Sequence, residues 1–333
     1  MRVGVVGLGY WGPNLVRNLH DIPGAEAAWM CDQRPEALAT VGRRYPAVRQ
    51  TRHLDEMLED ETLDAVAVVT PVGTHYDLAM RVLEAGKHVY VEKPLAASSD
   101  DARALIPAAY ERRLVLMPGH TFLYSPPVIR IRDLIRSGEL GEIYFISMSR
   151  VNLGLHQSDV SVIWDLAPHD FSILLYWLDQ APTRIFTMGR ACIMSRQDDV
   201  AFINCEFESG TIAHVELSWL APSKLRRTTV VGSDKMVVYD DCSNEPVRLY
   251  DSGVMPRNPE SFGEYLKYRT GDIVSPHIEG IEPIALEMED FCAAVRSGSS
   301  PRSSPELGLE VVRMIEAAER SLTEESAVSS AAG

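Results

Sequence analysis

Hydrophobic residues in the first third of the chain gather in short runs, and stretches with helical spacing separate these runs. Residues 2–7 are rich in valine, whereas Leu15, Val16 and Leu19 recur on one face of a helix. The strands predicted in this way are 2–7, 25–32, 63–71, 88–92 and 114–120, and the helices between them are 9–22, 35–45, 76–86 and 99–113. Several of these strands are apolar on both faces, which is typical of a parallel sheet covered by helices on both sides.

The pattern changes after about residue 120, where polar and apolar residues alternate through many of the predicted strands. Such alternation indicates antiparallel strands with one buried face. The predicted strands are 143–154, 183–194, 200–210, 211–220, 226–233 and 235–241, and the predicted helices are 126–141, 165–180, 282–298 and 304–322.

We therefore expect an α/β fold class with two domains. The first, at 1–121, is an α/β domain with a parallel sheet. The second, at 122–322, is a C-terminal α+β domain with a large, mostly antiparallel open sheet. Its last helix, about 305–322, is a candidate to pack back on the first domain, and 323–333 has the composition of a flexible tail.

Composition places the chain among ordinary globular proteins. Its 333 residues are 46% hydrophobic and 24% charged, with no apolar run of the roughly 20 residues that a membrane helix needs. The start of the chain has no signal-peptide pattern, so we expect a cytoplasmic protein. The formal charge of −15 disfavours nucleic acid or an anionic membrane as a partner. The cysteines lack CxxC or metal-ligand spacing and are expected to be buried thiols, namely Cys31, Cys192, Cys205, Cys242 and Cys292.

Three glycines, Gly7, Gly9 and Gly12, separate the first predicted strand from the first predicted helix, in "GLGYWG". The first glycine permits a tight turn, the second lets the backbone approach a pyrophosphate, and the third lets helix and strand pack closely. The helix N-terminus adds N–H groups and positive dipole. The alternative is a tight turn without a ligand, but the order of strand, glycines and helix favours a dinucleotide site. The domain at 1–121 is therefore expected to be an N-terminal Rossmann dinucleotide-binding domain.

Asp32 ends the second predicted strand, 20 positions after Gly12. At that place a carboxylate can hydrogen-bond both hydroxyls of the adenosine ribose, and it disfavours a 2′-phosphate. NAD is therefore the expected cofactor. NADP is the alternative, because Arg34 could meet a phosphate, and Asp32 could also be a plain exposed residue at a strand end.

A carboxylate, an ammonium and a proline stand at the end of the strand predicted from residue 88, as Glu92, Lys93 and Pro94. Doubly wound sheets bind ligands outside the carboxyl ends of their strands, so Lys93 can reach a substrate oxygen and stabilise negative charge on it. The bond before a proline is also the one place where a cis peptide is cheap. A solvated loop start is the alternative.

Asp165 and His169 stand four residues apart in a predicted helix, so their side chains share one face and can converge on one reacting atom. Pro168 is compatible with this helix if it lies in the first turn, where its missing N–H would have no partner. An imidazole titrates near pH ~6.5 and suits a general base. A structural cap or a core pair is the alternative for these two residues.

These stretches together resemble the Gfo/Idh/MocA family of oxidoreductases. The resemblance rests on "VGVVGLGYWGPNLVRN", on the "EKP" of 92–94, on the Asp165–His169 pair and on "TPVGTH" at 70–75, and it covers nearly the whole chain. Within the family the chain resembles bacterial sugar-nucleotide 3-dehydrogenases and ketoreductases, through "GHTFLYSP", "WDLAPHD" and "YRTGDIV". The family's helix often opens with a glycine-rich stretch, whereas this chain has "VIW" at 162–164, which bears on the local loop shape and substrate register.

The resemblance implies roles for particular residues. Lys93 would contact the nicotinamide ribose and the substrate hydroxyl, His169 would be the general acid/base, and Asp165 would bind substrate or relay a proton. The Lys93–Pro94 bond would be cis. The expected cofactor-binding residues are Gly7, Gly9, Tyr10, Trp11, Gly12, Asp32, Gln33, Arg34, Thr70, Pro71, His75, Glu92, Lys93 and Pro94. The expected substrate-binding residues are Phe122, Tyr124, Arg150, Asn152 and His156.

The expected reaction is reversible hydride transfer between nicotinamide and a ring hydroxyl or ketone of a sugar, first of all a nucleotide-linked (deoxy)sugar. Arg150 or Arg269 could pair with a diphosphate. No metal is expected, because the cofactor supplies the redox chemistry. The alternatives are a free sugar or inositol dehydrogenase and a non-enzymatic cofactor-sensing regulator. Apolar side chains on the second sheet predict a homodimer or homotetramer formed by sheet faces.

Overall fold

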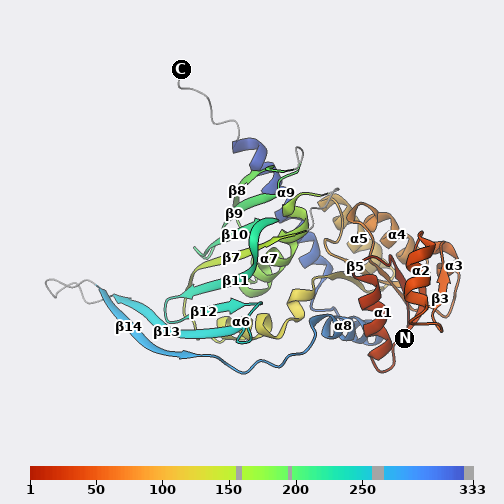
Figure 1. Ribbon diagram of the computed structural model, residues 1–333, viewed down its shortest axis with the longest axis horizontal. Helices are drawn as coiled ribbons and strands as arrows, with labels where there is room; N and C mark the ends of the chain where they lie inside the picture. Colours follow the sequence, from red (N-terminus) through yellow and green to blue (C-terminus); the bar gives the residue numbers. More distant parts are fainter. Residues whose placement is uncertain (155–159, 194–196, 257–265, 326–333) are drawn as a thin grey trace, which may run out of the picture. The chain divides into compact units, whose positions relative to one another are not determined.

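The computed structural model describes residues 1–154, 160–193, 197–256 and 266–325 (Figure 1). The chain divides into two compact units. Unit 1 consists of Met1–Tyr124 and Ile281–Arg313, and unit 2 consists of Ser125–Gly280 and the chain from Met314 onward. This division differs from the expected boundary of a second domain at 122–322, because a late segment of the chain returns to unit 1.

Unit 1 is built on a sheet of six strands among the described residues, in the order β3-β2-β1-β4-β5-β6. All neighbouring strands are parallel. The strands are β1 (Arg2–Val6), β2 (Glu26–Cys31), β3 (Arg49–Thr51), β4 (Ala65–Val68), β5 (His88–Glu92) and β6 (Leu116–Gly119). Every residue of β4 is buried, as expected for a central strand with both faces covered.

Helices cover this sheet. They are α1 (Gly12–Asp21), α2 (Pro35–Gly42), α3 (Leu54–Leu58), η1 (Val72–Thr74), α4 (His75–Glu84), α5 (Ser99–Glu111), η2 (Thr121–Tyr124) and α8 (Pro283–Ser297). Helix α4 packs on α5, whereas α8 packs on α1 and η2. The N-terminus of α5 is capped by Ser98, whose side chain accepts a hydrogen bond from the Asp101 N–H at 3.1 Å. Helix α8 is thus the late segment that completes unit 1.

Unit 2 is built on a sheet of eight strands among the described residues, in the order β14-β13-β12-β11-β7-β10-β9-β8. The β7–β10 pair is parallel and its other neighbouring pairs are antiparallel, which confirms the predicted mostly antiparallel sheet. The strands are β7 (Ile143–Leu153), β8 (Arg184–Arg190), β9 (Val200–Glu206), β10 (Ile212–Ser218), β11 (Leu220–Gly232), β12 (Met236–Asp240), β13 (Val247–Pro256) and β14 (Leu266–Val274).

Three helices accompany the second sheet: α6 (Pro126–Arg136), α7 (Val162–Leu178) and the later part of α9 (Pro305–Glu325). Helix α7 packs on β9 and β10, whose residues alternate between buried and more exposed. The C-terminal part of α9 reaches β8, where the Ser321 hydroxyl accepts a hydrogen bond from the Thr187 N–H at 3.0 Å. Helix α9 therefore belongs to unit 1 up to Arg313 and to unit 2 beyond it, whereas the expectation placed it in the second domain and made it a candidate to pack back on the first.

The cysteines are free thiols, and all of them lie in the described ranges. Cys31, Cys205 and Cys292 are buried as expected. The expectation is wrong for Cys192 and Cys242, which are exposed because each follows the end of a strand, β8 and β12 respectively. A search of the described helices finds none with the length and apolarity to cross a membrane.

Candidate active site

The three glycines of the first turn differ in the space around them. Gly7 has φ of +93°, and a Cβ there would lie 2.2 Å from the Val69 carbonyl oxygen. A Cβ on Gly12, the first residue of α1, would lie 2.1 Å from the Gly7 carbonyl oxygen. At Gly9, by contrast, the position of a Cβ is open, with no atom within 4 Å. The turn is therefore packed at both ends and leaves the middle of its backbone open to a ligand, as a pyrophosphate requires.

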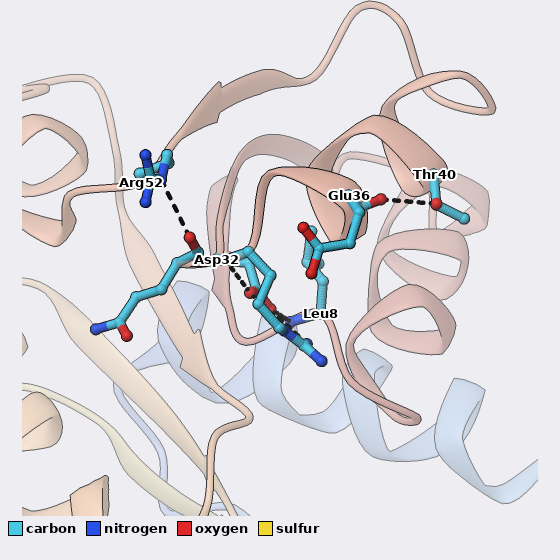
Figure 2. Close-up of polar contacts among 7 residues, drawn as sticks. Leu8, Asp32, Glu36, Thr40 and Arg52 are labelled. Atoms are coloured by element: carbon cyan, nitrogen blue, oxygen red, sulfur yellow. Dashed lines mark hydrogen bonds and ion pairs between the residues drawn. The ribbon is translucent and has the colours of Figure 1, made fainter.

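Asp32 follows β2 and is held by several donors. Its Oδ2 accepts hydrogen bonds from the Leu8 N–H at 2.7 Å and from Arg34 Nη2 at 2.9 Å (Figure 2). Its Oδ1 accepts from Arg34 N at 2.8 Å and from Arg34 Nε at 3.0 Å. Burial disfavours the charged form, but these hydrogen bonds outweigh burial and lower the pKa of Asp32 to about 2. The carboxylate is 8% exposed and stays ionised as an acceptor.

A cavity of about 780 Å³ opens beside this carboxylate, entirely within unit 1. Among the residues predicted to bind a cofactor, those that line the cavity are Gly7, Gly9, Asp32, Gln33, Arg34, Thr70 and Pro71. Arg52 lines it as well and donates from Nε to the Gln33 carbonyl at 3.1 Å, which brings a second guanidinium to the end of β2 (Figure 2). Arg52 and its neighbour His53 were not among the predicted site residues, because both lie in a short loop without periodicity. Glycine turn, ionised acceptor and cavity together fit an adenosine diphosphate moiety.

His75 lies close to this site but serves a different purpose. It is 1% exposed, and its two ring nitrogens lie 2.8 Å from the Pro94 carbonyl oxygen and 2.7 Å from the Thr70 carbonyl oxygen. Burial lowers its pKa, so the ring is neutral and donates its single N–H to one of these two carbonyl oxygens. His75 does not line the cavity, and its contact with the cofactor stays a prediction. The Lys93–Pro94 peptide, held in this way, is cis as expected.

Helix α7 carries the expected acid/base pair. Asp165 Oδ2 accepts a hydrogen bond from Trp219 Nε1 at 3.1 Å, and His169 stands one turn later on the same helix. Both side chains are partly exposed. The helix begins at Val162, so Pro168 lies six residues further along and not in the first turn, as the sequence analysis had assumed. The helix tolerates this proline although the Trp164 carbonyl loses its usual i+4 donor.

Comparison with known families decides the identity of the chain. Residues 1–120 match the family model "Oxidoreductase family, NAD-binding Rossmann fold", and residues 128–238 match the model of the Gfo/Idh/MocA C-terminal domain. The chain belongs to the Gfo/Idh/MocA family. It is accordingly an NAD-dependent oxidoreductase, and NAD is confirmed as its cofactor.

Relatives of known activity cover almost the whole chain. The UDP-N-acetylglucosamine 3-dehydrogenase of Acidithiobacillus ferrooxidans is 28% identical over 304 residues, 89% of this chain and 92% of the relative. The scyllo-inositol 2-dehydrogenase (NAD(+)) of Bacillus subtilis is 27% identical over 315 residues, 90% of this chain and 88% of the relative. The crystal structure of GenD2 from gentamicin A biosynthesis, in complex with NAD, superposes with a TM-score of 0.83 and 26% identity, covering 98% of this chain and 95% of that one.

The remaining cofactor residues expected from the Gfo/Idh/MocA resemblance lie around the turn and at the end of β5. Tyr10 and Trp11 are 81% and 40% exposed and pack edge to face with ring centroids 5.1 Å apart. Neither residue lines the cavity, and neither does Glu92, Lys93 or Pro94. A contact of these residues with the cofactor stays a prediction.

Two of the substrate residues expected from the resemblance are structural. Tyr124 is 1% exposed, donates to Asp290 Oδ2 at 2.7 Å and accepts from the Ser303 N–H at 3.1 Å, so it belongs to the core of unit 1. Arg150 is 6% exposed and forms a bidentate ion pair with Asp170, with N···O distances of 2.8 and 2.9 Å. A guanidinium committed to a buried carboxylate does not fit the expected contact with a diphosphate.

The other expected substrate residues have mixed outcomes. Phe122 and Asn152 are partly exposed, on η2 and β7, and stay candidates. Arg269 on β14 pairs with Asp251 at 3.0 Å. His156 lies outside the described residues.

His120 is a buried histidine that was not among the predicted site residues. It follows β6 and is 1% exposed, and neither ring nitrogen has a hydrogen-bond partner in the part of the chain that the structure describes. Burial lowers its pKa to about 3, and the positive charge of Lys93 contributes to the shift. Its position at the carboxyl end of a parallel strand, within "GHT", was the one available signal.

Proposed function

We propose that the protein reversibly oxidises a ring hydroxyl of a nucleotide-linked (deoxy)sugar. Two observations support this proposal. The relatives include a UDP-N-acetylglucosamine 3-dehydrogenase and an NAD-bound enzyme of gentamicin A biosynthesis. This chain also carries Lys93, Asp165 and His169. A regulator that only senses the cofactor would not need an acid/base pair and a lysine. These three residues are therefore the observation that carries the proposal.

NAD and the side chains of the protein have separate roles in the proposed reaction. When bound, NAD accepts the hydride or returns it. In the oxidative direction His169 takes the hydroxyl proton, since neutral imidazole is a base of suitable strength near pH 7. Lys93 stabilises the negative charge that develops on the same oxygen, and fixed charge of this kind is usually the largest catalytic contribution. Asp165, held by Trp219, binds the substrate or relays the proton.

The second candidate is a free inositol or sugar dehydrogenase. It is favoured by the inositol dehydrogenases among the relatives, which are about as similar to this chain as the sugar-nucleotide enzyme is. The buried Arg150–Asp170 pair also removes one cation that a diphosphate could use. Removal of the nucleotide from the substrate discriminates the two candidates, because only a sugar-nucleotide enzyme should then lose affinity.

The experiment follows nicotinamide absorbance with NAD or NADP over a panel of nucleotide sugars, free sugars and inositols, and with the corresponding keto sugars and reduced cofactor. Wild type is compared with His169→Ala and with His277→Ala, which removes an exposed histidine of the same unit. Turnover of one nucleotide sugar that is lost only in His169→Ala supports the proposal. Turnover of free inositols alone replaces the nucleotide sugar with the second candidate, and cofactor binding without turnover of any substrate contradicts both.

We also propose that two copies associate through the open face of the second sheet. Cross-strand partners share a face, and Ile212 pairs with Phe145 while Phe202 pairs with Met188. These four side chains are 39–69% exposed, on neighbouring strands β7, β10, β9 and β8. Such a patch is typical of a protein interface. Light scattering should give an oligomer that Phe202→Asp disrupts and that Tyr110→Ser, an exposed change in unit 1, leaves intact.

A further inference from the structure

A buried polar cluster in unit 1 lies directly beside Lys93. We define the carboxyl cluster as Tyr90, Glu92, Thr121 and Glu287. Tyr90 and Glu92 are two residues apart on β5, so both side chains leave the same face of the sheet. On that face α8 supplies Phe291, whose ring centroid lies 6.0 Å from that of Tyr90. Tyr90 and Glu287 are both 0% exposed.

Gly119 gives the cluster its space. This residue of β6 pairs with Glu92 across the sheet. A Cβ on Gly119 would lie 2.3 Å from the Tyr90 hydroxyl oxygen and 3.1 Å from Glu92 Oε2. Any other residue would therefore push these two oxygens away, so the glycine permits a hydroxyl and a carboxyl to meet inside the sheet.

Glu287 is the inner acid of the cluster. Its Oε2 accepts a hydrogen bond from Thr121 Oγ1 at 2.7 Å, and the Tyr90 hydroxyl also favours its charged form. Its Oε1 is buried and has no hydrogen-bond partner among the described residues. A fully buried carboxylate with an oxygen that no donor reaches is far more costly than an un-ionised carboxyl. Burial accordingly raises the pKa of Glu287 well above its usual range, and the charge of Glu92 adds to the rise.

Glu92 is the outer acid, partly exposed, and directly precedes Lys93 in the chain. The Tyr90 hydroxyl and the Lys93 N–H both favour its charged form. Burial raises its pKa to about 7, against the opposing effect of the Lys93 ammonium. Near neutral pH the outer acid therefore ionises, while the inner acid keeps its proton.

We propose that Glu287 is a positioning residue that stays un-ionised, so that the Glu92–Glu287 pair carries one negative charge, on Glu92, next to the ammonium of Lys93. The buried Glu287 and the partly exposed Glu92 do not both ionise, because like charges repel where little solvent screens them. The single charge balances Lys93 and orients it, whereas a second charge would draw the ammonium inward. Glu287 thus acts on the reaction through Tyr90 and Glu92 without touching substrate.

The other titratable groups around the cluster do not supply the missing charge balance. Tyr124 and Asp290 are bonded to each other at 2.7 Å, and Asp290 also accepts the Arg302 N–H at 2.8 Å. His120 stays neutral because of burial and the nearby Lys93. The charge of Lys93, by contrast, acts directly on the carboxyl of Glu92.

The direct test is difference infrared spectroscopy of the full-length protein. At pH 8 the wild type should show the carbonyl stretch of an un-ionised carboxyl, and Glu287→Gln should remove it. Glu92→Gln should keep that band but lose a second band that grows in as the pH falls through about 7. Glu289→Gln, an exposed change on the same helix, should change neither band. Absence of the band in wild type, or its survival in Glu287→Gln, overturns the proposal whether or not the proposed dehydrogenase activity is found.

The kinetic test rests on the proposed function and uses the substrate that the panel identifies. Glu287→Ala should lower kcat by about 10- to 100-fold, since a catalytic group displaced by about 1 Å loses that much, with the KM for NAD unchanged. Glu287→Gln should restore kcat and keep the wild-type pH profile, because the amide is uncharged and keeps the shape of the acid. A purely structural role predicts equal losses in both variants, and an ionised Glu287 predicts a shifted pH profile in Glu287→Gln.

Discussion

Two buried polar sites in this protein are built on opposite plans. In unit 2, Arg150 and Asp170 are almost fully buried, and two short hydrogen bonds join the guanidinium to the carboxylate. In unit 1, next to Lys93, His120 and Glu287 are equally buried, yet the described residues offer no partner to either ring nitrogen or to Glu287 Oε1. Buried polar groups that are hydrogen-bonded to each other stabilise a fold. Buried polar groups without hydrogen-bond partners cost stability and are typical of functional sites.

Removal of Asp170 should have the largest effect on stability. Asp170→Ala leaves Arg150 buried without its partner, and such a change costs about 3–5 kcal/mol of the free energy of unfolding. Glu206→Ala is the matched control, because its pair with Arg184 is exposed and exposed pairs are worth about 0–1 kcal/mol. Denaturant unfolding measures both, and similar losses in the two variants would remove the distinction drawn above.

Removal of the Lys93 charge should instead affect the rate. Lys93→Met should lower kcat by about 10²–10³-fold, the usual loss when one charge-stabilising group is removed, while the denaturation midpoint changes less than in Asp170→Ala. Lys235→Met provides the control, since that lysine forms a half-exposed pair with Glu139 in unit 2. A collapse of stability with intact turnover in Lys93→Met would assign Lys93 to the fold.

Asp32 should make the stability of unit 1 depend on acid pH. Its folded pKa of about 2 lies below the ordinary 3.8, so its contribution is present above about pH 4 and is lost as the pH falls to about 2. The difference corresponds to about 2 kcal/mol. Asp32→Asn should therefore unfold more easily than wild type at pH 5 and equally easily near pH 2, whereas Asp100→Asn, an exposed change, should match wild type throughout. An unchanged gap at both pH values would contradict this assignment.

The smallest expected effect distinguishes two histidines that are both 1% exposed. His120→Leu should raise the free energy of unfolding by about 1 kcal/mol, because it removes a buried ring without partners. His75→Leu should lower it by about 1–3 kcal/mol, because it removes the hydrogen bond that the neutral ring donates to a carbonyl oxygen. Denaturation of the two variants side by side measures the sign, and a large loss in His120→Leu would show that the two histidines are alike.

Sequence patterns predicted the features that depend on local chain geometry. Gly7, Gly9 and Gly12 lie where the strand–turn–helix order requires them, and periodicity located most strands of both sheets. Patterns could not predict β3 and α3, which are too short for a period to develop. The strands β13 and β14 were also missed, because polar and charged residues interrupt the apolar alternation in both.

Long-range pairing accounts for the errors at the site. Arg150 has the sequence of an accessible strand residue, and its burial depends on Asp170, 20 positions away. Tyr124 became a core residue because Asp290 and Ser303 arrive from the far end of the chain. The same distance hid Glu287, since no local pattern indicates that an acid of α8 meets Tyr90 on β5.

The return of the chain to unit 1 has a consequence for biosynthesis. A ribosome delivers β5 and its Tyr90 and Glu92 long before it delivers α8, which begins at Pro283. Until then the sheet lacks the helix that covers this face, and the polar side chains there face water. The residues that line the cavity, from Val6 to Arg81, are made early. The core around Tyr90 and Glu92 is complete only once α8 has been made.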